Sequence, residues 1–129
     1  MPYSPLACGV LTGQNDSPDD LARDGYRPNP PRFQGDNFQN NLGLVREIQA
    51  IAGDKGCTPA HLALAWVLAQ GDDRVPIPGT KRRKHLEDNV GPLTVELTER
   101  DLACSAQSLP AGAAVGERYA PPQMKALNL

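Results

Sequence analysis

The chain has 129 residues and carries 13 lysines and arginines against 15 aspartates and glutamates, a net charge of −2. This is the size of one domain, and its slight acidity excludes a broad basic face for nucleic acid. Because no apolar run could cross a bilayer and the N-terminus does not resemble a signal peptide, we expect a cytoplasmic protein without a membrane partner.

The cysteines and histidines give no sign of a metal site. Cys8, Cys57 and Cys104 have no paired spacing, and His61 and His85 are far apart in the sequence. In a reducing compartment the cysteines are most simply free thiols. We therefore expect neither a disulfide nor a bound metal.

The first third of the chain predicts a strand, a loop and a helix. Residues 2–6 predict a short strand that ends at Pro5, because proline cannot donate a hydrogen bond to a sheet. Residues 13–37 are rich in Gly, Pro, Asn and Asp and predict a long loop with one helical turn at 18–23. From 38 to 55, apolar residues recur at steps of three and four, which predicts a helix with one buried stripe: Leu42, Val45, Ile48, Ile51 and Ala52.

The rest of the chain predicts further helices and one more strand. Thr58 and Pro59 are a typical N-cap and first helical residue, and the apolar run at 62–69 predicts a helix buried on most sides. Residues 75–78 predict a short strand, and residues 83–89 predict a helix. A last helix begins at Thr98, where Asp101 resembles the partner in a capping box.

The order of these elements favours an α/β fold with parallel strands. Two short parallel strands cannot form a sheet that is buried on both faces. We therefore expect the chain to be part of a larger architecture.

Four consecutive basic residues, 81–84, follow the second predicted strand. A strand that runs through a glycine turn into a helix N-terminus makes an anion site. There Gly79 would let the backbone approach a ligand, Thr80 would supply a hydroxyl, and Lys81 and Arg82 would supply charge. The same run is also typical of a solvated charge cluster or a nuclear-localisation tetrad, and the residues alone leave these readings open.

Three stretches together resemble the aldo-keto reductase superfamily: "YSPLACGVLTG" at 3–13, "GCTPAHLALAWVLAQG" at 56–71 and "VPIPGTKRRKHLEDN" at 75–89. The resemblance covers the chain from Pro2 to about Gln123. It implies that residues 1–129 are the C-terminal portion of one TIM (β/α)8 barrel domain, with strands seven and eight and their flanking helices and no second domain. It also implies that NADPH is bound without a Rossmann glycine motif.

The resemblance assigns cofactor contacts residue by residue. Tyr3 matches the aromatic residue that stacks on the nicotinamide ring. The stretch that cradles the pyrophosphate is matched by Ser4, Pro5, Leu6 and Cys8. The loop that binds the adenosine 2′-phosphate is matched by Gly79, Thr80, Lys81 and Arg82, and positions around the adenosine by His85, Asp88 and Asn89. We expect Lys81 and Arg82 to contact the phosphate and Arg83 and Lys84 to be solvated.

The function implied by the resemblance is an NADPH-dependent oxidoreductase that reduces small aldehydes or ketones to alcohols. The catalytic Asp, Tyr, Lys and His of the family come from earlier strands, so no catalytic residue is assigned, and we expect the 129 residues alone to be inactive. One alternative is a non-catalytic NADPH-binding regulatory module, like the potassium-channel β subunits of this superfamily, or an inactive fragment. Another is a small α-rich interaction domain whose basic run is a docking patch.

Overall fold

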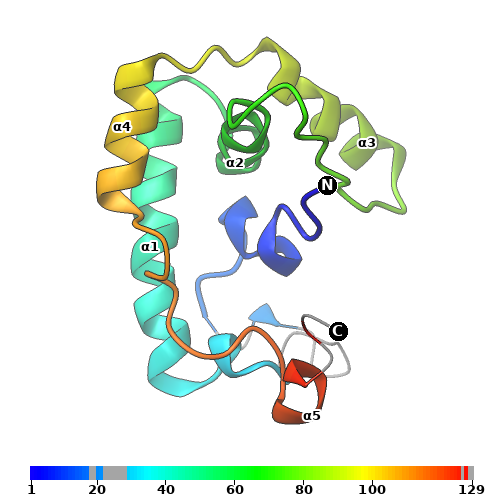
Figure 1. Cartoon of the computed structure of the whole chain (residues 1–129), viewed down its shortest axis with the longest axis vertical. Helices are drawn as coiled ribbons and strands as arrows, with labels where there is room; N and C mark the ends of the chain where they lie inside the picture. Colours follow the sequence, from blue (N-terminus) through cyan, green and yellow to red (C-terminus); the bar gives the residue numbers. More distant parts are fainter. Residues whose placement is uncertain (18–19, 22–28, 126, 128–129) are drawn as a thin grey trace.

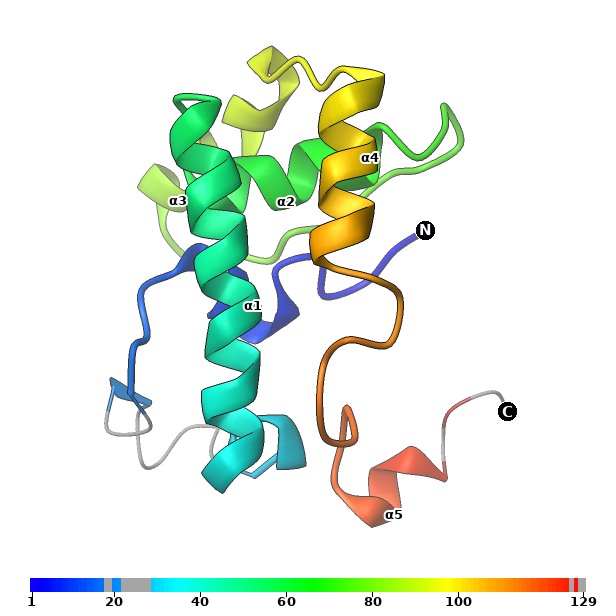
Figure 2. The same ribbon diagram turned by 90° about the vertical axis from the view of Figure 1, so that its left-hand side faces the viewer.

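The computed structural model describes residues 1–17, 20–21, 29–125 and 127, and Figures 1 and 2 show it from two perpendicular directions. The long helix α1, Gly35–Asp54, is flanked along its C-terminal half by α4, Glu99–Ser108. Helix α2, Pro59–Leu68, runs across α1 and separates it from α3, Arg83–Val90 (Figure 1). The N-terminal segment, residues 1–13, lies below α2 (Figure 1).

The predicted stripe on α1 is confirmed and organises the core. Leu42, Val45, Ile48 and Ala52 are buried, and Ile51 is half-buried. The helix begins at Gly35, three residues before the predicted start. An acidic residue in the first turn, Asp36, favours this earlier start because it complements the positive end of the helix dipole.

The predicted caps of α2 and α4 are also confirmed. The Thr58 hydroxyl accepts a hydrogen bond from the backbone N–H of His61 at 3.2 Å, with Pro59 at the first helical position. In α4, Thr98 accepts from the N–H of Asp101 at 3.3 Å, and the Asp101 carboxylate accepts from the N–H of Thr98 at 2.8 Å. Lys55 Nζ lies 2.6 Å from the same carboxylate, which ties the end of α1 to the start of α4.

The two predicted strands do not form. In the part of the chain that the structure describes, neither 2–6 nor 75–78 is paired in a sheet. A strand is stable only beside other strands, and two short segments do not provide a sheet. Pro76 and Pro78 also remove alternate N–H donors, which would face the same neighbour along one edge of a strand.

Helix α2 is less enclosed than its apolar run predicts. Leu62, Leu64 and Ala65 are buried, but Trp66 is 39% exposed. An apolar groove of about 250 Å³ lies along this side, lined by Pro5, Leu11, Ile48, Ile51, Leu62, Ala63, Trp66, Val67, Ser105 and Leu109. The expectation of burial on most sides therefore holds for the other residues of the run up to Leu68 but not at Trp66, because no described segment covers the groove.

Short helical segments complete the fold. They are η1 (Ala7–Thr12), η3 (Pro31–Phe33), η4 (Gly91–Thr94) and α5 (Pro121–Met124). Phe33 of η3 packs with Leu21, Phe38 and Leu42 in a small core against which Val10 of η1 also packs. The predicted loop at 13–37 thus contains η3 and the start of α1, and its predicted turn at 18–23 lies largely outside the described residues.

Candidate functional site

The backbone of the N-terminal segment is unusually bent. Ser4, Ala7 and Cys8 have φ values of +49°, +47° and +57°, in the left-handed region that residues with a Cβ rarely adopt. Such conformations cost on the order of 1 kcal/mol each and are concentrated at functional sites. Hydrogen bonds from the N–H of Ala7 to Ser4 O (2.9 Å) and from the N–H of Gly9 to Leu6 O (2.8 Å) close these turns.

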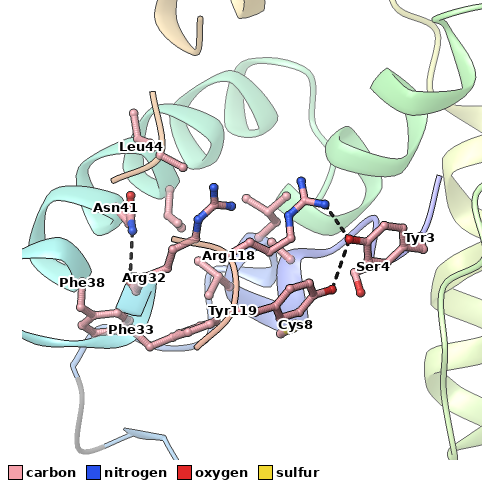
Figure 3. A pocket seen from close by; sticks show the side chains of 15 residues that line it. Tyr3, Ser4, Cys8, Arg32, Phe33, Phe38, Asn41, Leu44, Arg118 and Tyr119 are labelled. Carbon is pink, nitrogen blue, oxygen red and sulfur yellow. Dashed lines mark hydrogen bonds between the residues drawn. The ribbon is translucent and has the colours of Figure 1, made fainter. Parts of the chain in front are cut away.

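Tyr3 stands at the beginning of this segment and is 50% exposed. Its hydroxyl accepts a hydrogen bond from Arg118 Nη1 at 2.7 Å and another from the hydroxyl of Tyr119 at 3.2 Å (Figure 3). The hydrogen bond from Tyr119, followed by that from Arg118, lowers the pKa of Tyr3 below its ordinary value. The position of the ring is therefore set by residues 115 and 116 positions further along the chain.

A cavity of about 180 Å³, which we call the Tyr3 cavity, opens beside this ring. Side chains from the N-terminal segment, η3, α1 and a C-terminal segment, residues 114–119, line it: Tyr3, Ser4, Ala7, Cys8, Val10, Leu11, Arg32, Phe33, Phe38, Asn41, Leu44, Val45, Ala114, Arg118 and Tyr119 (Figure 3). Most of this wall is apolar, and its polar groups are hydroxyls, a thiol, an amide and two guanidinium groups.

The C-terminal segment is held against the cavity by Asn41. This side chain is only 8% exposed and accepts a hydrogen bond from the N–H of Val115 at 2.8 Å. Its amide group donates to Val115 O at 2.9 Å and to Arg32 O at 3.0 Å. Arg32 Nε adds a hydrogen bond to Gly116 O at 2.9 Å. Three hydrogen bonds thus fasten the segment that carries Arg118, and the bond from Asn41 to Arg32 O joins α1 to η3.

The basic segment lies elsewhere, at the start of α3. Residues 79–84 are all exposed, and none of these basic side chains forms an ion pair with a described residue. The Thr80 hydroxyl accepts from the N–H of Arg82 at 3.1 Å and thereby shapes the turn. A Cβ built on Gly79 would find nothing within 4 Å, so the backbone there is open to a ligand. Arg82 is the N-cap of α3 but makes no side-chain capping bond.

The predicted adenosine residues follow on α3. His85 Nδ1 lies 3.5 Å from Asp88 Oδ2, and the imidazole and carboxylate side chains are 45% and 50% exposed. Asn89 is half-buried at the end of the same helix. These residues lie on the helix that begins within the basic segment at Arg83, as the sequence predicted.

The structure divides the predicted cofactor residues into groups. Tyr3, Ser4 and Cys8 line the Tyr3 cavity, whereas Pro5 lines the apolar groove and Leu6 is the half-buried N-cap of η1. Of the described residues that line the Tyr3 cavity, none comes from 79–89. Among the described residues, the two halves of the predicted site therefore do not share this cavity.

Sequence reasoning missed Arg32, Asn41, Arg118 and Tyr119, which contribute most polar groups of the cavity. Asn41 could have been noticed, because it is a polar residue on the apolar face of α1 between Phe38 and Val45. The arginines and Tyr119 lie in Pro- and Gly-rich stretches without periodicity and gave no comparable signal.

The described residues contain neither a metal-binding cluster nor a membrane-spanning helix. The histidine, cysteine, aspartate and glutamate side chains there form no group of three or more that could hold a metal ion. None of the described helices is both long and apolar enough to span a membrane.

The chain is similar to known aldo-keto reductases. The model of the Aldo/keto reductase family matches residues 1–108. The chain is 46% identical over 119 residues to "Aldo-keto reductase yakc [NADP(+)]" of Schizosaccharomyces pombe, a match that covers 92% of this chain and 35% of that protein. It is 46% identical over 101 residues to "Aldo-keto reductase str7" of Strobilurus tenacellus, which covers 78% of this chain and 30% of the relative. "Probable aldo-keto reductase 1" of Glycine max is 41% identical over 119 residues, covering 92% and 34% of the two chains. The chain thus spans about a third of the length of these relatives.

Proposed function

Because the chain belongs to the aldo/keto reductase family, we propose that it supplies the cofactor-binding part of an NADPH-dependent enzyme that reduces aldehydes or ketones to alcohols. One observation carries the proposal. The basic segment at the start of α3 is exposed and forms no ion pair with a described residue, in a chain with this family match. The name of the S. pombe relative, which includes NADP(+), supports this choice of cofactor.

The proposal also concerns the fold of the domain to which the chain belongs. In a (β/α)8 barrel the helices form an outer ring and their apolar faces pack on the parallel strands. We propose that residues 1–129 belong to one such domain, in which 2–6 and 75–78 are strands seven and eight. The apolar groove along α1 and α2 supports this, because a barrel sheet would cover it.

The side chains at the start of α3 fit the adenosine 2′-phosphate. Lys81 and Arg82 would bind the phosphate dianion, and an Arg guanidinium can do so through two parallel hydrogen bonds. Open space at Gly79 allows the backbone to come close, and the uncapped N–H groups of α3 favour negative charge. Bound NADPH supplies a hydride for the carbonyl carbon.

At the other surface, Tyr3 would pack its ring against the nicotinamide, with Ser4 and Cys8 near the pyrophosphate. The bonds from Arg118 and Tyr119 hold the Tyr3 hydroxyl and so limit the rotation of the ring. A ring that is already ordered loses less entropy when it stacks on a ligand. Residues of this chain would therefore orient the cofactor, while protonation of the substrate is left to residues outside it.

Coenzyme preference tests the first part of the proposal. The double variant K81Q/R82Q should weaken NADPH binding roughly ten- to hundredfold while leaving NADH binding unchanged, since only NADPH carries the extra phosphate. The matched control is R83Q/K84Q, which removes the same charge from neighbouring exposed positions. Titration followed by NADPH fluorescence measures both. Equal effects of the two double variants would show a general charge effect and contradict the proposed phosphate site.

Reductase activity tests the second part. We would replace the matching third of the S. pombe relative with this chain and follow the loss of NADPH absorbance with benzaldehyde. The chimera should reduce the aldehyde, and the K81Q/R82Q chimera should lose its preference for NADPH. A folded chimera that binds NADPH but reduces no carbonyl compound would instead favour a regulatory cofactor-binding module.

A further inference from the structure

The Tyr3 cavity has an apolar wall and a positively charged side. Phe33, Phe38, Leu44 and Val45 supply apolar surface from η3 and α1. Arg32 and Arg118 are its only charged lining residues among those the structure describes, and no described aspartate or glutamate lines it. Figure 3 shows both guanidinium groups along the same side of the cavity.

The two guanidinium groups keep donors for a ligand. A guanidinium has five N–H donors. Arg118 uses Nη1 to reach Tyr3, and Arg32 uses Nε to reach Gly116 O. Neither forms an ion pair with a described carboxylate. Their charges are therefore not neutralised by the described part of the chain, which favours a negatively charged partner.

These charges are also held in place before any ligand arrives. The hydrogen bonds of Asn41 to the backbone of Val115 fix the segment just before Arg118. The bond of Arg118 to Tyr3 then fixes its side chain. Prearranged donors bind an anion with less loss of entropy than flexible ones. The hydrogen bond from Tyr119, and then that from Arg118, lowers the pKa of Tyr3, in keeping with donors that face an anion.

We propose that the Tyr3 cavity binds a small amphipathic carboxylate, with Arg118 on the carboxylate and the aromatic and aliphatic wall on the carbon skeleton. This inference rests on the proposed function and narrows its substrate class to carbonyl compounds that carry a carboxylate. A phosphate group of the cofactor shares the same anionic chemistry, so the experiment must separate the two sources.

The test compares benzoate with its neutral isostere benzamide on the 129-residue chain, by NMR titration. Benzoate should bind about tenfold more tightly than benzamide, because a charge-assisted hydrogen bond is stronger than a neutral one. R118Q should weaken benzoate binding by about the same factor and leave benzamide unchanged. R118K, which keeps the charge but loses the planar fork, should restore part of the affinity.

Arg74 provides the matched control, because it is exposed and its Nε pairs with Asp73 at 3.2 Å, away from the cavity. R74Q should bind benzoate as the unaltered chain does, and circular dichroism should show the same helix content for all variants. Equal binding of benzoate and benzamide, or an equal loss in R74Q and R118Q, would overturn the inference.

Titration with NADPH separates the two anion sources. If benzoate and NADPH bind together, the carboxylate site is distinct from the phosphate sites and the inference stands. If NADPH displaces benzoate, and R118Q weakens NADPH as much as benzoate, Arg118 serves the cofactor and the inference fails. Benzoate binding without any NADPH binding would contradict the proposed function and leave the carboxylate site supported.

Discussion

Asn41 offers the sharpest test of how the C-terminal segment is held. In N41A the side chain loses its two donated hydrogen bonds, to Arg32 O and Val115 O, and the one it accepts from the N–H of Val115. Because this site is nearly buried, water cannot fully replace these partners until the segment moves away.

The expected loss of stability in N41A follows from the number of hydrogen bonds that the variant loses. Each hydrogen bond contributes about 0.5–1.5 kcal/mol net, so losing these should lower the free energy of unfolding by about 2–4 kcal/mol. That is a large part of the roughly 5–15 kcal/mol by which a domain is stable. N40A is the matched control, because Asn40 is exposed on the same helix and its loss should change stability by less than about 0.5 kcal/mol.

Two measurements check this prediction. Urea unfolding followed by the fluorescence of Trp66, the single tryptophan, gives the stability of each variant. Limited trypsin digestion reports the segment itself, since cleavage after Arg118 should become faster only in N41A. If N41A and N40A unfold at the same urea concentration and are cut equally fast, the Asn41 bonds do not hold the segment.

Three further outcomes are expected. Gly116 and Gly112 both have φ of +85°, but only at Gly116 would an added Cβ lie 3.1 Å from the backbone of η3. In urea unfolding, G116A should therefore lower the free energy of unfolding by about 3 kcal/mol and G112A by about 1 kcal/mol. The pKa of Asp101 is lowered from 3.8 to about 2, chiefly by its hydrogen bond with Lys55, so the ionised carboxylate stabilises the fold above about pH 4 and this stabilisation is lost as the pH falls towards 2. The melting temperature of D101N should therefore lack this acid dependence and approach that of the unaltered chain near pH 2. G79A should leave stability within about 0.5 kcal/mol yet weaken NADPH binding in a fluorescence titration, and unchanged binding would exclude close approach of the backbone there.

The predictions that succeeded depend on residues close in sequence. Thr58 bonds the N–H three residues later, and Thr98 and Asp101 bond each other across one helical turn. The buried stripe of α1 follows from the helical period alone. Such signals lie within a few positions of each other, so a single sequence contains them in full.

The predictions that failed depend on neighbours elsewhere in a fold. Residues 75–78 have the composition of a strand, but pairing needs a second strand at the right distance. The burial of α2 likewise needs a surface to cover Trp66, which no described segment supplies. The composition of a segment indicates whether it could form a strand or a buried helix. The surrounding chain decides whether that strand is paired or that helix is covered.

Sequence alone determined helices α1 to α4, the caps of α2 and α4, the position of the basic segment before α3, and the resemblance on which the cofactor hypothesis stands. Only the tertiary structure decided that Asn41 reaches Val115 across 74 positions and that Arg118 reaches Tyr3 across 115. Helical hydrogen bonds join residues three or four apart, so the local pattern specifies them. The contacts that build the Tyr3 cavity join distant segments of irregular backbone, and their pairing emerges only when α1 and η3 bring those segments together.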